Sequence, residues 1–448
     1  MADFGAFWPK NCVTVQGSFD PGESPCFDSV GLLLFPLCSG EGNYSATPEA
    51  VFCLFFFRPI ETGCLQELES ARLGNSSSQK GTSLALRVLI AGGGTGGHIF
   101  PALAVAHALV VRHGAEVHFV GTARGIETRL VPEAGFPLHL IEVGPLKKVS
   151  LKTRLNTLAA LPRSLFACRR LIRELKPGVV LGIGGYASGP GVGAAILLRV
   201  PTMLFEPNAM PGLVNRLTGK RVQAAAINFA AAAHWFRNAE VTGIPVRPGF
   251  FTLPPPPVGA PHLLIFGGSQ GARIFNVTMP AVSAALLEAI PGLTILHQSG
   301  TREAEVTAAA YAATGADAAR WQVLPFLDDM PSYFAKASLV VARSGASTVA
   351  ELAAAGRPSL LVPFAAAADD HQTRNAEEMV KAGAAVMLRE QDVLATSKLQ
   401  QTLKELLSAP DSIAVMGAAA KTQARPGAAE RIADRLAALA AERERIRG

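Results

Sequence analysis

From residue 86 onward, short apolar runs alternate along the chain with longer stretches rich in alanine and leucine. The apolar runs have the length of buried strands, and they include residues 86–91 (LRVLIA), 116–121 (EVHFVG), 177–185 and 200–208. Residues 101–114 (PALAVAHALVVRHG) lie between the first two runs and predict a helix that ends at Gly114. This alternation predicts an α/β fold in which parallel strands are covered by helices on both faces.

A proline-rich segment, residues 242–261, interrupts the alternation, because proline suits neither a helix interior nor an inner strand. Residues 262–276 (HLLIFGGSQGARIFN) then repeat the opening order of strand, glycine turn and helix. We therefore predict two Rossmann-like domains, with a binding site in the cleft between them. The predicted bounds are 86–245 for the N-terminal domain, 246–262 for the linker, 263–425 for the C-terminal domain and 426–448 for a C-terminal helix that packs back on the N-terminal domain.

Residues 1–85 show no sustained period, and their apolar pieces are separated by proline, glycine and serine. They hold five of the six cysteines and end in GNSSSQKGTS, a composition typical of flexible linkers. We predict an appendage outside the main fold, and two explanations stay open: an extra disordered segment, or a start assigned upstream of the real one. The remainder has Cys168 as its one cysteine, which is typical of a reducing compartment.

The chain is basic, with a formal net charge of +6 and a pI of about 9.1. Such a balance favours an acidic partner, either nucleotide phosphate, nucleic acid or an anionic membrane. No apolar run reaches the roughly 18 residues that span a bilayer. One leucine-rich segment predicts a surface that contacts anionic lipid, with a solvated amphipathic helix as the alternative. It carries eight basic residues and no acid: Lys147, Lys148, Lys152, Arg154, Arg163, Arg169, Arg170 and Arg173.

Three glycine loops follow predicted strands, at residues 92–98 (GGGTGGH), 184–191 (GGYASGPG) and 267–273 (GGSQGAR). The first also fits the G-x-G-x-x-G fingerprint of dinucleotide-binding folds. That fingerprint requires an acid at the tip of the second strand to bind the ribose, and here this strand ends HFVGTARG. A nicotinamide or flavin enzyme is therefore disfavoured. Tight turns alone could explain one such loop, whereas three of them favour a cleft for a pyrophosphate and a sugar.

Several longer motifs occur together in a fixed order across residues 87–440. They are GGGTGGHIFPALAVA, LGIGGYASGP, EPNAMPGLVNR, TGIPVR, GGSQGARIFN, ARSGASTVAELAAAGRPSLLVPF and DDHQTRNA. This set resembles the MurG family, the N-acetylglucosaminyltransferases of peptidoglycan synthesis. The resemblance implies the GT-B fold, with two Rossmann-like domains facing each other across a cleft. It leaves residues 1–85 unmatched.

The activity implied by the resemblance is inverting transfer of GlcNAc from UDP-GlcNAc to the muramoyl 4-hydroxyl of undecaprenyl-linked lipid I, which gives lipid II. No metal or other cofactor is expected. The expected partners are UDP-GlcNAc, lipid I, the anionic cytoplasmic membrane surface and other cell-wall synthesis proteins, but no nucleic acid. The resemblance places the enzyme peripherally on the cytoplasmic face of the inner membrane. Two alternatives stay open: another UDP-sugar-dependent lipid glycosyltransferase, or a non-catalytic protein that binds nucleotide sugars at the membrane.

The chemistry of sugar transfer suits this interpretation. Negative charge develops on the leaving diphosphate and requires a metal or an array of hydrogen-bond donors. The sequence has no Asp-x-Asp motif for a metal, and its adjacent acids in LDDMP and ADDHQ are typical of helix caps. Donors are present in the amides of residues 267–273, and the resemblance places Ser269 and Arg247 at the diphosphate. We expect Arg343 in the cleft, with a surface charge as the alternative.

Glu351 has two interpretations. The sequence TVAE matches a helix capping box, yet a carboxylate can also accept two hydrogen bonds from a ribose diol. The resemblance favours the ribose, and we count Glu351 with the catalytic residues. It also implies further contacts: Leu327 at the uracil, Ala346, Ser347 and Thr348 in the nucleotide loop, Asn208, His371 and Gln372 at the sugar, Thr95, Gly96 and Gly97 in the first glycine loop, and Tyr186 on the acceptor side. At position 371 the family more often has glutamine.

His98 closes the first glycine loop and is the candidate general base. Inverting transfer needs a base for the proton of the attacking hydroxyl, and imidazole has an unperturbed pKa near 6.5. A position at the start of a helix disfavours the cation and keeps the ring neutral. The alternative is a structural histidine that orders the loop.

Overall fold

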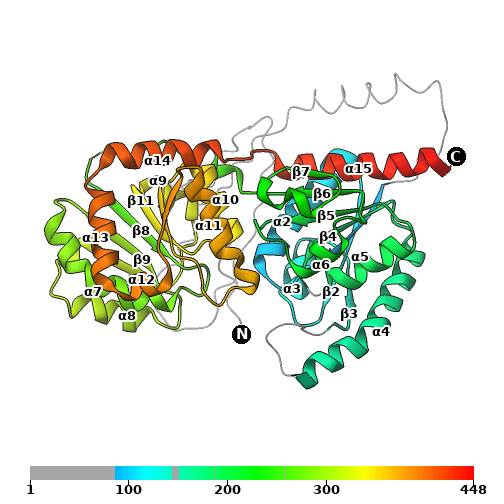
Figure 1. Ribbon diagram of the computed structural model, residues 1–448, viewed down its shortest axis with the longest axis horizontal. Coiled ribbons are helices and arrows are strands. Elements are labelled where there is room, and N and C mark those ends of the chain that lie inside the picture. Colours follow the sequence, from blue (N-terminus) through cyan, green and yellow to red (C-terminus); the bar gives the residue numbers. More distant parts are fainter. Residues whose placement is uncertain (1–85, 144–150, 186, 258, 448) are drawn as a thin grey trace, which may run out of the picture. The chain divides into compact units, whose positions relative to one another are not determined.

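The computed structural model describes residues 86–143, 151–185, 187–257 and 259–447, and it describes only the backbone of residues 151–160, 368 and 447. These residues are organised around two β-sheets (Figure 1). The strand order is β3-β2-β1-β4-β5-β6-β7 in the first sheet and β10-β9-β8-β11-β12-β13 in the second. Every strand pair is parallel, which confirms the predicted α/β fold class.

The first sheet has apolar central strands because helices bury both of its faces. Helices α2, α3 and α15 cover one face, and α4 and α5 cover the other. The strands are β1 (Arg87–Gly92), β2 (Glu116–Thr122), β3 (Leu138–Ile141), β4 (Val179–Gly184), β5 (Thr202–Glu206), β6 (Ala224–Ile227) and β7 (Ala239–Val241). The helices are α2 (Gly96–His113), α3 (Glu127–Glu133), α4 (Leu151–Leu175), α5 (Ser188–Leu197), α6 (Leu213–Thr218) and α15 (Ala428–Arg447).

The second sheet repeats this plan. Helices α7, α8 and α13 pack on one face, whereas α9, α10 and α11 pack on the other. The strands are β8 (His262–Phe266), β9 (Thr294–Gln298), β10 (Trp321–Leu324), β11 (Leu339–Ala342), β12 (Ser359–Leu361) and β13 (Ala385–Met387). The helices are α7 (Arg273–Ala289), α8 (Ala304–Ala312), α9 (Met330–Lys336), α10 (Ala346–Ala355), α11 (His371–Lys381), α12 (Glu390–Leu394), α13 (Thr396–Leu407) and α14 (Pro410–Thr422). Short 3₁₀ helices lie at Ala230–Trp235, Pro248–Phe250, Ala318–Arg320 and Ala368–Asp370.

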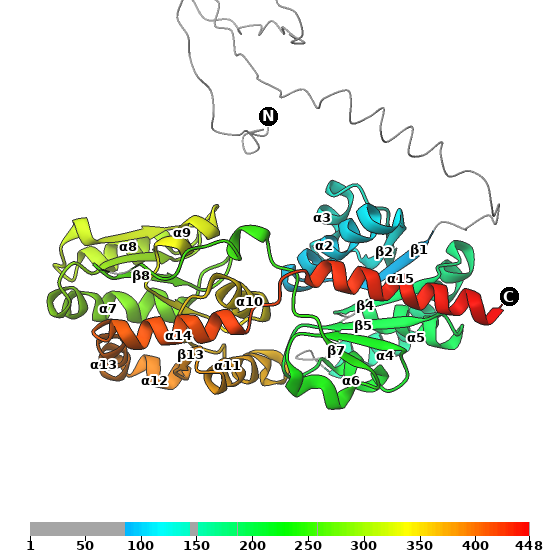
Figure 2. The same cartoon turned by 90° about the horizontal axis from the view of Figure 1, so that it is seen from above.

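Helix α15 belongs to the core of the first sheet although it follows α14 of the second (Figure 2). Its residues Ile432 and Leu436 are fully buried there. At the surface Asp434 accepts hydrogen bonds from Arg112 and contacts the His113 ring at 2.8 Å.

The domain limits near residues 245, 262 and 425 remain predictions. Among the described residues, no helix combines the length and apolar character that crossing a bilayer requires.

Helix α2 begins five residues earlier than the sequence predicts. Proline favours the first turn of a helix, so the pattern suggested a start at Pro101. In the structure Thr95 is the N-cap, Gly96 is the first helical residue and Pro101 lies inside the helix. The predicted end is correct, because Gly114 adopts the left-handed conformation (φ 58°) that closes the helix. His98 is consequently the third residue of α2.

Candidate active site

The first two glycine loops contact each other where β1 and β4 end. The N–H of Gly93 donates to the carbonyl of Gly184 at 3.3 Å. A Cβ atom on Gly92 would overlap that carbonyl, and a Cβ atom on Gly185 would overlap the carbonyl of Gly93. Gly92 and Gly93 also have φ angles of 140° and 150°, which favour glycine. Close backbone approach therefore explains these glycines, and it places the first turn of α2 beside the end of β4.

His98 is oriented by the loop that precedes it. A 2.9 Å hydrogen bond joins its Nδ1 to the hydroxyl of Thr95, and its Nε2 faces Gly184. The pKa of His98 is lowered to about 4, mainly by burial and also by the charge of His371, while the charge of Glu127 acts in the opposite direction. The ring is neutral at pH 7, as predicted, but the main cause is burial. His98 lies on α2 beside the first sheet and His371 on α11 beside the second, and they are close enough for their charges to interact.

Asn208 is held by a buried carboxylate. Glu206, at the end of β5, accepts hydrogen bonds from the backbone N–H of Asn208 at 3.0 Å and from its side chain at 3.2 Å. The second carboxylate oxygen accepts from the N–H of Gly212 and from the side chain of Asn215. Burial raises the pKa of Glu206, and these four hydrogen bonds lower it. The loop over residues 206–212 is therefore fixed at both ends by one side chain.

Asn375 of α11 connects this loop to the second sheet. Its side-chain oxygen accepts from the N–H of Ala209 at 2.8 Å, and its side-chain nitrogen donates to Asn208 at 3.1 Å and to the carbonyl of Ser344 at 3.2 Å. The Ser344 hydroxyl in turn donates to the carbonyl of Gln372. The candidate sugar contacts Asn208 and Gln372 are thus joined through two buried residues.

Arg247 and Glu351 lie side by side, 3.8 Å apart. The Arg247 side chain is 56% exposed and stacks over the ring of Phe250 at 5.1 Å, whereas the Glu351 side chain is 23% exposed. Burial raises the pKa of Glu351 to about 7, and the charge of Arg247 lowers it. Helix α10 has Gly345 as its N-cap, so Glu351 lies in the second turn and the capping-box interpretation is wrong. Ala346, Ser347 and Thr348 form the first turn.

The raised pKa of Glu351 predicts a pH dependence of donor binding. The ionised carboxylate is the better acceptor for both ribose hydroxyls, because protonation turns one of its oxygens into a donor, and the ionised form becomes dominant as the pH rises through about 7. The dissociation constant for UDP-GlcNAc should therefore fall roughly tenfold between pH 6 and pH 8. Isothermal titration calorimetry across this range measures the change. A Glu351→Gln variant should show no such step, and a flat wild-type profile would contradict the assignment.

The glycine loop after β8 presents its middle residues to solvent. Gly268 and Gly271 have φ angles of 93° and 71°, and the N–H of Gly271 donates to the carbonyl of Gly268 at 2.9 Å. A Cβ atom on Gly271 would overlap the carbonyl of Ser299, so the loop packs tightly against the end of β9. Ser269 is exposed, and helix α7 begins soon after it. This combination is typical of an anion site at a helix N-terminus.

Arg343 lies in a largely buried ion pair. Its side chain is largely buried, pairs with Glu390 at 2.7 Å and donates to the carbonyls of Val362 and Pro363. It also stacks on two phenylalanine rings, and burial lowers its pKa. The low exposure contradicts the alternative of a surface charge, whereas the expected place of Arg343 in the cleft stays a prediction. In the structure the guanidinium supports the segment after β12.

The other described candidates lie at or shortly before the starts of α2, α9 and α11. Leu327 is buried in the apolar core of the second sheet, and its contact with the uracil stays a prediction. Thr95 and Gly97 are exposed at the start of α2, with Gly96 half-buried between them. His371 and Gln372 begin α11, directly after Asp369 and Asp370, whose φ angles of 53° and 54° are left-handed. Asp329 and Asp370 occupy the N-cap positions of α9 and α11, and Asp369 lies 3.5 Å from Arg216. Tyr186 lies outside the described residues.

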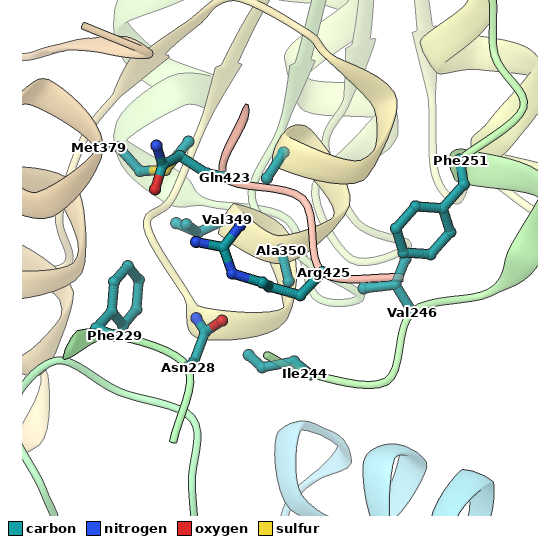
Figure 3. A pocket seen from close by; sticks show the side chains of 11 residues that line it. Asn228, Phe229, Ile244, Val246, Phe251, Val349, Ala350, Met379, Gln423 and Arg425 are labelled. Carbon is teal, nitrogen blue, oxygen red and sulfur yellow. The ribbon is translucent and has the colours of Figure 1, made fainter. Parts of the chain in front are cut away.

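A cavity of about 30 Å³ lies beside α10 (Figure 3). It has room for about one water molecule, whereas ligand pockets measure roughly 300–1,000 Å³. None of the predicted site residues lines it, although Val349 and Ala350 precede Glu351 on the same helix. The cavity is therefore separate from the candidate active site. It is lined by Asn228, Phe229, Ile244, Val246, Phe251, Val349, Ala350, Ala353, Met379, Gln423 and Arg425.

Comparison with known proteins decides between the alternatives. Residues 88–227 match the glycosyltransferase family 28 N-terminal domain, and residues 262–432 match its C-terminal domain. The UDP-N-acetylglucosamine–N-acetylmuramyl-(pentapeptide) pyrophosphoryl-undecaprenol N-acetylglucosamine transferase of Anaeromyxobacter dehalogenans is 45% identical over 355 residues, which cover 78% of this chain and 92% of that protein. The protein of the same name from Solibacter usitatus is 44% identical, over 80% of this chain and 97% of its own. The chain belongs to the MurG family.

A solved structure agrees with this assignment. The crystal structure of Acinetobacter baumannii MurG matches with a TM-score of 0.68 and 30% identity, over 78% of this chain and 99% of that chain. The predicted GT-B fold is thereby confirmed, as is the predicted enzyme class, a UDP-GlcNAc-dependent N-acetylglucosaminyltransferase of lipid II synthesis.

Sequence reasoning missed several residues that organise the MurG-family site. Glu206 and Asn215 lie in the quoted motif EPNAMPGLVNR, and Asn375 lies in DDHQTRNA. Asn375 follows Gln372 by three residues, so both lie on one face of α11, and this spacing was the available signal. Glu127 was also missed, although it is a buried carboxylate beside the first glycine loop.

Proposed function

We propose that this MurG-family chain joins GlcNAc from UDP-GlcNAc to lipid I at the site built by His98, Asn208, Arg247, Glu351 and Gln372. The single observation that carries the proposal is the hydrogen-bonded connection from Asn208 through Asn375 to Ser344 and Gln372. It brings candidate sugar contacts from the two sheets into one network, next to the electrostatic contact between His98 and His371. Such a network would hold the transferred sugar in one geometry, which transfer requires.

The donor nucleotide has a complete set of candidate contacts around the second sheet. The Glu351 carboxylate accepts the two ribose hydroxyls, and the backbone at Leu327 contacts the uracil. Arg247, the Ser269 hydroxyl and the amides of residues 267–271 surround the diphosphate. The partial positive charge at the start of α10 and α7 adds to this field. Arg343 has no direct part in this proposal.

The transfer step is a single displacement at C1 of GlcNAc. The acceptor oxygen forms a bond to C1 while the bond from C1 to the phosphate oxygen breaks, and the attacking hydroxyl loses its proton to Nε2 of His98. UDP leaves with the electron pair, and its developing charge is stabilised by Arg247 and the amide donors. Attack on the face opposite the leaving group inverts the configuration. Asn208, His371 and Gln372 hold the sugar hydroxyls during this step.

A lipid-linked acceptor requires a surface that meets the membrane, and we assign this role to α4. Ser164, Cys168 and Ile172 face the core, whereas Arg163 and Phe166 are exposed on the opposite side. Arg169, Arg170 and Arg173 are also exposed. Lys147 and Lys148 lie outside the described residues, and the side chains of Lys152 and Arg154 are not described. We place the enzyme on the cytoplasmic face of the inner membrane, as a peripheral protein.

Charge reversal on α4 tests the membrane role. Each basic residue near an anionic bilayer contributes about 1 kcal/mol, so Arg163→Glu, Arg169→Glu and Arg173→Glu together should weaken vesicle binding by at least about 100-fold. Co-sedimentation with phosphatidylglycerol vesicles measures the loss. A matched triple variant of exposed residues in the second half, Arg302→Glu, Lys336→Glu and Lys404→Glu, should bind as the wild type does. Equal binding by both triple variants would exclude α4 as the contact.

A ligand panel tests the donor assignment. UDP-GlcNAc should bind at least about tenfold more tightly than UDP-glucose, because the site contacts the sugar as well as the nucleotide. NADH should not bind, because β2 ends without the acid that a dinucleotide fold requires. Equal affinity for the two UDP-sugars would favour a transferase of different donor specificity.

A further inference from the structure

Glu127 is the first residue of α3, and its side chain is almost completely buried (1% exposed). A buried carboxylate requires hydrogen-bond donors, and three are present. One oxygen accepts from the N–H of Gly94 at 2.7 Å. The other accepts from the N–H of Thr122 at 3.0 Å and from the Thr122 hydroxyl at 3.1 Å. The carboxylate therefore links the first glycine loop to the end of β2.

Three glycines surround this carboxylate. A Cβ atom on Gly93 would lie 2.5 Å from the carboxyl carbon, and one on Gly121 would lie 2.7 Å from Cγ. A Cβ atom on Gly125 would overlap the carboxylate itself. Two of these glycines lie outside the GGGTGGH motif, in the segment GTARGIE. The space for the Glu127 side chain thus depends on glycine in two separate loops.

The position of Glu127 differs from that of the ribose-binding acid in dinucleotide-binding folds. Dinucleotide-binding folds have an acid at the tip of the second strand, directed toward a ribose. Here the tip has no acid, and the carboxylate that follows it on α3 instead turns back to the glycine loop. Its hydrogen-bonding capacity is used within the protein.

The contacts continue from Glu127 to His98. Glu127 holds the N–H of Gly94, the next residue is Thr95, and the Thr95 hydroxyl is hydrogen-bonded to Nδ1 of His98. The other ring nitrogen then faces Gly184. The negative charge of Glu127 also acts directly on His98, where it opposes the burial and the His371 charge that lower the imidazole pKa.

We propose that Glu127 is a positioning residue for transfer, which holds the first glycine loop so that His98 is presented to the attacking hydroxyl. This role rests on the proposed function of His98 as the base. A residue of α3 thereby supports the catalytic base, and Gly121 and Gly125 of GTARGIE leave the space that its side chain needs.

The test is a kinetic comparison of the wild type with Glu127→Gln. The amide of Gln presents an N–H group to a backbone donor and loses the charge, so kcat should fall roughly 10- to 100-fold. The KM for UDP-GlcNAc should stay within about twofold, because the nucleotide contacts lie around the other sheet. Glu127→Asp should restore part of kcat. Glu133→Gln, an exposed residue of the same helix, is the matched control and should behave as the wild type.

A second variant and a hydrogen-exchange measurement also test the positioning role of Glu127. If Glu127→Gln does not fold, Thr122→Val removes only the hydroxyl donor and should lower kcat at least about threefold at unchanged donor KM. If the wild type forms no GlcNAc-lipid, the proposed function fails, and amide hydrogen exchange of residues 92–98 still decides: faster exchange in Glu127→Gln supports the positioning role, and unchanged exchange overturns it. A wild type that turns over, with Glu127→Gln at equal kcat, would overturn this inference alone.

Discussion

Replacing His98 with alanine should lower kcat for GlcNAc transfer by roughly 10²–10⁴, the usual contribution of a general base. The imidazole is neutral at pH 7, is fixed by the Thr95 hydroxyl and lies at the start of α2 beside the end of β4. Burial lowers its pKa to about 4, so it is a weaker base than free imidazole until the substrates change its surroundings. A bound diphosphate supplies negative charge, which raises the basicity of a neighbouring histidine.

The His98→Ala result is judged from steady-state kinetics together with UDP-GlcNAc binding. The donor dissociation constant should remain that of the wild type, because the nucleotide contacts lie around the second sheet. His107→Ala is the matched control, since His107 is an exposed residue of the same helix. Normal turnover in His98→Ala, or joint loss of folding and donor binding, would show that His98 is structural.

Replacing Glu351 with alanine should raise the dissociation constant for UDP-GlcNAc by at least about 10²-fold. Two hydrogen bonds from the ribose to a charged acceptor contribute roughly 1.5–3 kcal/mol each, and both are lost. Arg247 also loses its partner at 3.8 Å, although it keeps its stacking on Phe250. Glu351→Ala should therefore weaken donor binding, whereas His98→Ala should lower kcat and leave donor binding unchanged.

Calorimetry at pH 8 is the appropriate measurement for Glu351→Ala, because the wild-type carboxylate is largely ionised there. Glu305→Ala, an exposed residue of α8, is the control and should bind as the wild type does. A Glu351→Ala variant with wild-type donor affinity would remove Glu351 from the nucleotide site.

The hydrophobic pattern predicted the central strands well, because β1, β4 and β5 are apolar on both faces. It missed short strands such as β3, β7 and β13, which have only three or four residues and fewer buried positions. The start of α2 was wrong because Pro101 carries a strong helix-start signal. Tertiary contacts around the Thr95 cap override that local preference.

Residues of the candidate site were predictable only where they lie in a family motif and have side chains that suit the substrate. Arg247 and Glu351 are far apart in sequence, and the structure brings them together. Glu127 and Asn375 were not predictable in the same way, because their roles depend on hydrogen bonds to residues 33 and 166 positions away. The surroundings of Arg343 were not predictable, because the pairing with Glu390 and the stacking on two phenylalanines arise only in the folded chain.

Transfer of radiolabelled GlcNAc from UDP-GlcNAc to lipid I by the full chain tests the proposed activity and its site most directly. We expect a labelled lipid that depends on both substrates, carries GlcNAc on the muramoyl 4-hydroxyl with inverted configuration, and is lost in His98→Ala. UDP-glucose as donor and diacylglycerol as acceptor should give no comparable product. Label that passes equally to diacylglycerol, or UDP-GlcNAc that binds without any transfer to lipid I, would contradict it.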